Sequence, residues 1–189
     1  MKHKTCIWPG QDELMNEYHD NEWGVPVYDD KKHFEFIVLD TFQAGLSWKT
    51  ILYKRENFRK AFANFDIKKV SKFDEDKIQS LMQDAGIIRN QLKIRSTVTN
   101  AIAFMNIQKE FGSFNTYIWQ FVNGKVKVNK HLEHKSIPAT SIESDAMSKD
   151  LYARGFKFVG STICYAYMQA AGMVNDHVKD CFRYKQVNK

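Results

Sequence analysis

The stretch YHDNEWGVPVYDDKKHFEFIVLDTFQAGLSW, residues 18–48, combines aromatic rings with one carboxylate inside an apolar run. Tyr18, Trp23 and Trp48 supply rings, and Asp40 lies among the apolar residues of an expected helix. A carboxylate in such surroundings is costly to bury without a partner. Rings and carboxylates both attract positive charge, so the stretch predicts a pocket for a flat, cationic ligand. The alternative is that the rings fill the core and a neighbouring donor satisfies Asp40.

The rest of the chain reads as helices separated by capped breaks. Acidic or hydroxyl residues precede the apolar periodic segments, and glycine follows several of them, as at helix starts and ends. The expected helices are Phe34–Ala44, capped by Asp29 or Asp30, one after Ser47, short ones opened by Asp66 and Asp74, Asn90–Phe111, one from Ser113, one from Ser144 to Gly155, and Thr162–Ala171. Residues 124–129 alternate like a strand, but a lone strand is better interpreted as a loop. The sequence predicts an all-α fold.

Length and composition favour one domain with a polyanionic partner. The chain has 189 residues and is 43% hydrophobic, so we expect residues 1–189 to form one compact domain, or two helical lobes around one cleft. A net charge of +6 is a mild bias toward nucleic acid. No apolar run approaches the roughly 18 to 20 residues of a membrane span, and the N-terminus has no apolar signal segment. We therefore expect a cytoplasmic protein without membrane contact.

The cysteines and histidines suggest a metal site. Three cysteines argue against a disulfide framework, and Cys164 lies in an apolar run where a small buried residue is expected. Cys6 and His19 lie near one end of the chain, and His177 and Cys181 near the other, four residues apart and on one face if helical. Two thiolates and two imidazoles fill a tetrahedral, structural zinc site. The alternative is two solvated histidines and two free thiols.

The segment KIQSLMQDAGIIRNQLKIRSTVTNA, residues 77–101, predicts two helices joined by a tight turn at Gly86–Arg89. In such a helix-hairpin-helix, the second helix directs free backbone N–H groups and the positive end of its dipole at a DNA phosphate, without reading bases. Arg89, Lys93 and Arg95 add positive charge nearby. Helical hairpins are also common packing units, so simple packing is the alternative.

Six blocks of the chain, in this order, resemble the 3-methyladenine DNA glycosylase I family, a zinc-containing branch of the helix-hairpin-helix glycosylases. The blocks are YHDNEWGVP (18–26), QAGLSW (43–48), KREN (54–57), DAGIIR (84–89), FKFVGSTICYAYMQAAG (156–172) and VNDH (174–177). The similarity covers nearly the whole chain. It implies a helix-hairpin-helix glycosylase-like fold whose two ends are joined by one structural Zn²⁺ ion.

The resemblance also implies roles for individual residues. The zinc ligands of the family match Cys6, His19, His177 and Cys181. Its pocket aromatics match Trp8, Tyr18, Trp23 and Trp48, and the tip that fills the gap left by a flipped base matches Gly45 and Leu46. The expected hairpin contacts to DNA come from Gly86 and Arg89. There are two departures: Asp40, the candidate catalytic acid, replaces a glutamate of the family that is one methylene longer, and the hairpin has one glycine, Gly86, where the wider superfamily usually has two.

The implied activity is base-excision repair of alkylated double-stranded DNA, by hydrolysis of the N-glycosidic bond of 3-methyladenine. A base methylated at N3 is cationic, so its bond to deoxyribose is weak and it leaves as a neutral molecule. The enzyme extrudes the nucleotide, stacks the base between rings and holds it beside an acid. The family lacks the general-base aspartate of its superfamily, and no lysine is well placed for a Schiff base. We therefore expect a monomeric, monofunctional glycosylase without a lyase step.

Two other classes of protein remain open. One is a non-catalytic, zinc-stapled DNA-binding module that recognises damaged sites, and the other is a zinc hydrolase. A purine-sized pocket lined by the aromatic set and Asp40 favours the glycosylase over the binding module. A zinc hydrolase needs an open coordination position, which four protein ligands deny.

Overall fold

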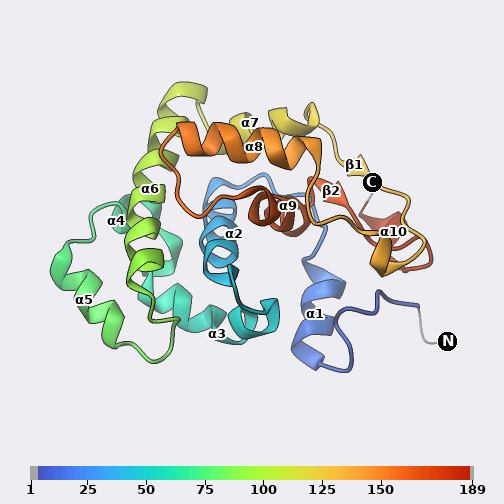
Figure 1. Ribbon diagram of the computed structural model, residues 1–189, viewed down its shortest axis with the longest axis horizontal. Helices are drawn as coiled ribbons and strands as arrows, with labels where there is room; N and C mark the ends of the chain where they lie inside the picture. The colour runs from blue at the N-terminus through green and yellow to red at the C-terminus, as the bar shows by residue number, and fades with distance from the viewer. Residues whose placement is uncertain (1–3, 188–189) are drawn as a thin grey trace.

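Helix α2, Asp30–Gln43, runs through the middle of the molecule (Figure 1). Its residues from His33 to Phe42 are all buried, which is the pattern of a core helix rather than of a surface helix with one apolar stripe. Asp29 caps it, accepting a hydrogen bond from the Lys32 N–H at 2.8 Å. Contacts with α3, α6, α7 and α9 enclose it. The apolar run around Asp40 is therefore the centre of the core.

The computed structural model describes residues 4–187, so residues 1–3 and 188–189 of the expected domain lie outside it. The all-α prediction is confirmed, since helices dominate the described chain. The elements are α1 Glu13–Asn21, α2 Asp30–Gln43, α3 Trp48–Ala61, η1 Ala63–Phe65, α4 Ile67–Val70, α5 Glu75–Gln83, α6 Gln91–Phe111, α7 Phe114–Ile118, η2 Trp119–Val122, β1 Lys127–Val128, η3 His134–Ser136, α8 Ile142–Ala153, α9 Ser161–Ala170, β2 Val174–Asn175 and α10 Arg183–Gln186. None of the helices within residues 4–187 is long and apolar enough to cross a membrane.

Most predicted helix starts are confirmed by their caps. Side chains of Ser47, Asp66, Asp74, Asn90 and Ser113 each accept a hydrogen bond from a backbone N–H three residues later. These bonds satisfy donors that the first turn of a helix leaves free. Local chemistry is therefore sufficient to place these helix starts.

Two helix predictions need correction. Helix α8 begins at Ile142 rather than at Ser144, because Ser141 is its cap. Ser144 is the third helical residue, and its hydroxyl accepts from the Ser141 N–H at 2.7 Å while Ser141 accepts from the Ser144 N–H, a capping box. Helix α1 was not predicted, although Asp12 caps it by accepting from Met15 N at 3.0 Å.

The interpretation of residues 124–129 as a loop is wrong. Lys127–Val128 forms a short strand, β1, that pairs in parallel with β2, Val174–Asn175. The Lys127 N–H donates to Met173 O at 2.9 Å, and Asn129 N–H donates to Asn175 O at 3.1 Å. The partner strand lies far away in the sequence, so the alternating segment has no visible partner until the chain folds.

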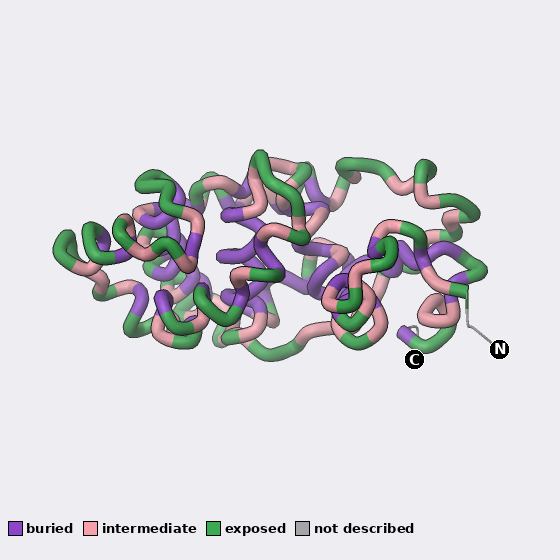
Figure 2. The backbone as a smooth tube through the Cα atoms, turned by 90° about the horizontal axis from the view of Figure 1, so that it is seen from below, coloured by how far each residue is buried: buried purple, intermediate pink, exposed green. Residues whose placement is uncertain are grey.

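Both ends of the described chain lie on the same side of the molecule, near β1, β2 and α10 (Figure 1). A backbone hydrogen bond from Phe182 N to Lys4 O, at 2.9 Å, joins them. Nearby, the segment after α9 approaches Val25 so closely that a Cβ on Gly172 would lie 2.3 Å from its carbonyl carbon. Buried residues run through the interior of the elongated body, and exposed residues follow its outer turns (Figure 2).

Candidate functional site

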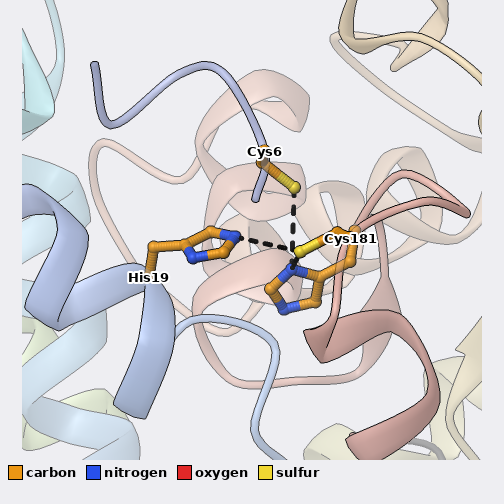
Figure 3. Close-up of side chains that lie close together, drawn as sticks. Cys6, His19 and Cys181 are labelled. Carbon is orange, nitrogen blue, oxygen red and sulfur yellow. Dashed lines mark hydrogen bonds between the residues drawn. The ribbon is translucent and has the colours of Figure 1, made fainter. Parts of the chain in front are cut away.

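Four side chains from the two ends of the chain form a buried cluster of metal-ligand type. The donor atoms of Cys6, His19, His177 and Cys181 all lie within 4.8 Å of one another. Cys181 Sγ is 3.5 Å from His19 Nε2 and 3.6 Å from His177 Nδ1, and Cys6 Sγ is 3.7 Å from the same Nδ1. Figure 3 shows Cys6, His19 and Cys181 directing these atoms toward a common centre. The structure therefore brings together all four residues predicted to bind zinc.

The cluster has the dimensions of a tetrahedral zinc site. Zn–S bonds of about 2.3 Å and Zn–N bonds of about 2.0 Å place sulfur and nitrogen roughly 3.5 Å apart around a tetrahedral ion. The three sulfur–nitrogen distances are close to this value. The second ring nitrogens are also held, as is usual for metal-bound histidines. His19 Nδ1 is 2.6 Å from Asp20 Oδ1, and His177 Nε2 is 3.1 Å from the carbonyl oxygen of Trp23. The residues fit a zinc ion.

The backbone that carries His177 and Cys181 is not the helix that their spacing suggested, and the cluster shifts the pKa of its two cysteines. Residues 177–181 form turns rather than a helix, and the Cys181 N–H donates to Val178 O at 2.8 Å. A hydrogen bond with Cys6 lowers the pKa of the Cys181 thiol, and hydrogen bonds with His177 and His19 lower it further. The same hydrogen bond between the two cysteine side chains raises the pKa of Cys6. The environment thus favours thiolate at Cys181, which is the form that binds metal.

An aromatic cavity of about 160 Å³ lies next to the cluster. A closed cavity of roughly 150 Å³ holds a benzene ring, so a partly open cavity of this volume accepts a flat heterocycle. It is lined by Trp8, Tyr18, Trp23, Asp40, Gln43, Trp48, His134, Ala166, Gln169 and Ala170. All four predicted aromatics and Asp40 therefore line one cavity, which favours a base-binding enzyme over a module in which these rings fill the core.

The rings of the cavity pack against the histidines of the metal cluster. Trp8 and Trp23 meet edge to face at 5.1 Å between ring centroids. Trp23 lies 4.7 Å from the ring of His177, and Trp8 lies 5.5 Å from that of His19. On the other side, Tyr18 and Trp48 are 5.0 Å apart. The metal cluster therefore supports one wall of the cavity.

Polar atoms without partners are concentrated in this cavity. Within residues 4–187, eight buried side-chain nitrogen or oxygen atoms have no hydrogen-bond partner, and five of them belong to residues that line the cavity. They are Trp8 Nε1, Tyr18 Oη, Asp40 Oδ2, Trp48 Nε1 and His134 Nδ1. Buried polar groups are usually satisfied, so this concentration indicates a site whose partner comes from a ligand.

Asp40 is a strongly perturbed acid of the cavity. It is 2% exposed, and burial raises its pKa well above the ordinary value for aspartate. Its charge in turn helps to raise the pKa of Tyr18, after the larger effect of burial. A cationic ligand would favour the ionised form of Asp40, so the cavity is electrostatically suited to positive charge.

The predicted tip, Gly45 and Leu46, follows α2 at the edge of the cavity. Both residues are exposed, and Gly45 has a φ of +79°, a left-handed conformation that favours glycine. Lys93, in the first turn of α6, donates to Phe42 O at 2.9 Å and to Ala44 O at 2.6 Å. The tip is thereby tied to the helix that follows the predicted DNA-binding turn.

The turn between α5 and α6 is held from behind by α3. Lys54 donates to Ala85 O at 3.0 Å and to Gly86 O at 3.2 Å, and Asn57 donates to Gly86 O at 3.2 Å. A Cβ on Gly86 would lie 2.9 Å from Asp84 Oδ1 and 3.1 Å from Asn57 Cγ, so a larger residue would displace these two side chains. Arg89 is exposed on the turn. Lys54 and Asn57, from the KREN block, position the hairpin.

Sequence reasoning missed five residues of the cavity. Gln43 lies in the QAGLSW block, and Ala166, Gln169 and Ala170 lie in the block 156–172, so the resemblance had already marked their segments. His134 lies in the irregular segment between β1 and α8, where no periodicity or motif points to a site.

Comparison with known proteins gives a consistent result. A family model described as methyladenine glycosylase matches residues 8–184. DNA-3-methyladenine glycosylase 1 of Escherichia coli (strain K12) is 50% identical over 181 residues, which are 96% of this chain and 97% of that protein. DNA-3-methyladenine glycosylase of Haemophilus influenzae is 46% identical over 176 residues, 93% of this chain and 95% of that protein.

Solved structures agree with these sequence matches. A crystal structure of 3-methyladenine DNA glycosylase I superposes with a TM-score of 0.93 at 46% identity, covering 95% of this chain and 98% of that chain. The Staphylococcus aureus enzyme, whose structure describes 3-methyladenine recognition, has a TM-score of 0.92 at 33% identity and covers 98% of this chain and 96% of that chain.

Proposed function

The chain belongs to the methyladenine glycosylase family, and on this premise we propose that it is a DNA glycosylase that removes 3-methyladenine from alkylated double-stranded DNA. The observation that carries the proposal is the aromatic cavity with unpartnered polar atoms around Asp40. Its rings supply faces for stacking, and its buried acid selects for positive charge. A DNA-binding module without chemistry has no need of such a cavity.

The reaction breaks the bond between C1′ of deoxyribose and N9 of the methylated base. The bonding electron pair goes to the base, which loses its positive charge, and water adds to C1′ and releases its proton to solvent. Because the base becomes neutral as it leaves, little acid catalysis is required. The enzyme extrudes the nucleotide and orients it between the rings of the cavity.

Asp40 has two ways to contribute, and they differ in kinetic signature. A carboxylate beside the base attracts a charge that fades in the transition state, so it selects the substrate and affects KM. A carboxylate beside the sugar attracts a charge that grows in the transition state, so it affects kcat. We assign Asp40 to the base, because it lines the cavity with the stacking rings. No lysine lines the described cavity, which supports a monofunctional enzyme without a lyase step.

We assign the grip on DNA to two exposed segments. The N-terminal end of α6 directs its backbone N–H groups toward a phosphate, and Arg89 adds charge. The Gly86 N–H donates to Asp84 Oδ1 at 2.7 Å and the Ile87 N–H donates to Asp84 O at 3.3 Å, so we assign the phosphate to amides that follow Ile87. Gly45 and Leu46 fill the space left by the flipped nucleotide. Lys93 keeps these two segments in register, since it joins α6 to the tip.

We further propose that Cys6, His19, His177 and Cys181 hold one structural Zn²⁺ ion. Four protein donors complete a tetrahedron, so the ion would join the ends of the chain and take no part in hydrolysis. Its contribution is mechanical, because the histidines support Trp8 and Trp23. We place the protein in the cytoplasm, where thiolate ligands stay reduced. We also propose that it is a monomer.

The test of the function is incubation of the purified protein with methylated duplex DNA, followed by chromatographic identification of the released bases. We expect free 3-methyladenine and abasic sites without strand breaks. Binding to methylated DNA with no base released would support the non-catalytic module. Strand breaks formed together with base release would disprove the monofunctional assignment.

A further inference from the structure

The segment that joins β1 to α8 is fixed at its two ends. At the first end, the buried Asp176 accepts a hydrogen bond from Asn129 at 2.6 Å, and the same oxygen lies 3.1 Å from His131 Nε2. At the second end, the Ser141 N–H donates to Ser144 Oγ at 2.7 Å in the capping box of α8. Both ends are therefore held before any ligand binds.

Between these ends lie residues 132–140, which we call the strap. Within residues 4–187, no hydrogen bond or ion pair joins the strap to any residue outside it except His131. The other bonds that it makes lie within the strap itself. All its residues except His134 and Ile137 are exposed, and Ile137 packs against the hydrophobic core. A segment held by so few contacts opens at a low cost in free energy.

The strap lies between the cavity and a groove on the outside of the molecule. His134 lines the cavity together with Asp40 and Gln169. It also lines the groove, whose volume is about 290 Å³. Other residues of this groove come from the N-terminal segment, with Ile7, and from the turn after His177, with Val178. The groove therefore gives the strap room to move outward, away from the cavity.

The cavity reaches the proposed DNA-binding side at a different place. Gln43 and Trp48 line the cavity and flank the tip at Gly45 and Leu46. The tip lies between α2 and α3, whereas the strap follows β1, on the side of the two chain ends (Figure 1). In the proposed complex, DNA at the tip covers the first boundary of the cavity. The strap forms a second boundary.

We propose that the strap is a gate, which opens into the outer groove and lets the excised base leave while DNA still occupies the tip. The inference rests on the proposed function, because it takes the departing ligand to be a free base. A nucleotide that is part of a strand enters from the DNA side, and hydrolysis removes this constraint. Opening of a segment over a site limits product release in many enzymes. The packing of Ile137 is then the main barrier to opening.

The test measures exchange of free 3-methyladenine on protein saturated with a duplex that contains a stable abasic-site analogue. Ile137→Ala weakens the packing of the strap, and Ile137 is not among the described residues that line the cavity. Ile142→Ala is the matched control, because Ile142 begins α8 and is 85% exposed. Association and dissociation rates are followed by stopped-flow fluorescence, and melting temperatures check that each variant is folded.

We expect Ile137→Ala to raise the association and dissociation rates together, by roughly tenfold, because it eases opening of the gate in both directions. The Kd should then stay unchanged, and Ile142→Ala should behave as the wild type does. Unchanged rates in Ile137→Ala, or a rise confined to dissociation, would overturn the gate. So would DNA that stops exchange of the base in the wild type.

Hydrogen exchange of the wild type gives a second measurement that needs no variant. Amides of the strap should exchange faster than those of its anchors at Asn129, His131 and Ser144, and equal protection would contradict the gate. If the wild type releases 3-methyladenine from methylated DNA but the gate fails these tests, the proposed function stands. A wild type that neither binds nor releases 3-methyladenine overturns both.

Discussion

Glu35 and Asp40 are carboxylates of the same helix, and their side chains are buried to a similar extent, but the fold treats them differently. Glu35 is 6% exposed and Asp40 is 2% exposed. Glu35 Oε1 accepts from Arg55 and from Arg59, each at 2.8 Å, and its other oxygen is 3.2 Å from Lys32. Asp40 Oδ2 has no hydrogen-bond partner among residues 4–187. The chain itself supplies the hydrogen-bond partners of Glu35, whereas Asp40 keeps an oxygen that a ligand can bind.

The pKa directions of the two groups follow from their partners. Burial raises the pKa of Glu35, but Arg55, Lys32 and Arg59 more than offset this effect, and the pKa falls below the ordinary value. Burial acts without such compensation on Asp40, whose pKa is raised. A paired buried charge belongs to the architecture, whereas an unpaired one in a cavity marks a functional site. Substitutions at paired and unpaired buried groups should therefore have different effects on stability and on ligand binding.

The largest effect is expected at the buried cluster of Cys6, His19, His177 and Cys181, whose four side chains we assign to zinc. Cys181→Ala should abolish zinc binding and destabilise the protein by roughly 5 kcal/mol or more, because zinc binding and folding are coupled. Zinc content by atomic emission and melting temperature should fall together. Cys164→Ala removes a buried thiol outside the cluster and should keep the zinc. A zinc-free preparation with wild-type stability would disprove the metal site.

The next largest effect on stability is expected at the ion pairs of Glu35. Arg55→Ala removes a side chain that bonds both Glu35 and Glu22, and it leaves Glu35 buried with weaker compensation. We expect a loss of about 3 to 5 kcal/mol in the free energy of unfolding, measured with urea. Arg59→Ala, at a more exposed partner of Glu35, should cost less than about 1 kcal/mol. Equal losses in the two variants would contradict the central role of Arg55.

Trp48→Ala tests the stacking surface of the cavity. A stacked base is typically worth about 1 to 3 kcal/mol per aromatic residue, so the affinity for free 3-methyladenine and for free adenine should fall by similar factors. Calorimetric titration of both bases measures this effect. A loss confined to the methylated base would instead show that Trp48 recognises the methyl group.

The smallest effect is expected at Asp40, and it has the opposite sign for stability. Because the folded pKa of Asp40 lies above the unfolded value of about 3.9, wild-type stability falls as pH rises from about 4 to the folded pKa and is constant above it. Asp40→Asn removes this loss, so the variant should be more stable than the wild type at pH 7, and this difference in stability should shrink as the pH falls toward 4. Urea unfolding across this pH range provides the measurement.

The same substitution separates stability from function. Asp40→Asn should raise KM for methylated DNA more than it lowers kcat, and it should reduce the preference for 3-methyladenine over adenine. For the wild type, affinity for the cationic nucleotide should increase with pH until Asp40 is ionised in the free protein. A variant with unchanged selectivity would place Asp40 in the core and leave charge selection to the rings.

Local sequence was sufficient for much of the architecture and for the chemical nature of the site. Caps such as Ser47, Asp74 and Asn90 act over three residues, and the apolar run of α2 identifies a core helix by its composition. Interactions of this range are visible in the order of residues. The six blocks added which side chains belong together, although they carried no information about geometry.

Other features required the folded chain, because they depend on which distant segments meet. The strand at Lys127 exists because Val174 lies beside it, and His134 lines the cavity because Asp176 anchors its segment. The sequence places Glu35 and Asp40 in equivalent apolar surroundings. Arg55 lies one helix away and reaches Glu35, so the choice of which carboxylate stays unpaired is made by long-range packing, on which local periodicity has no bearing.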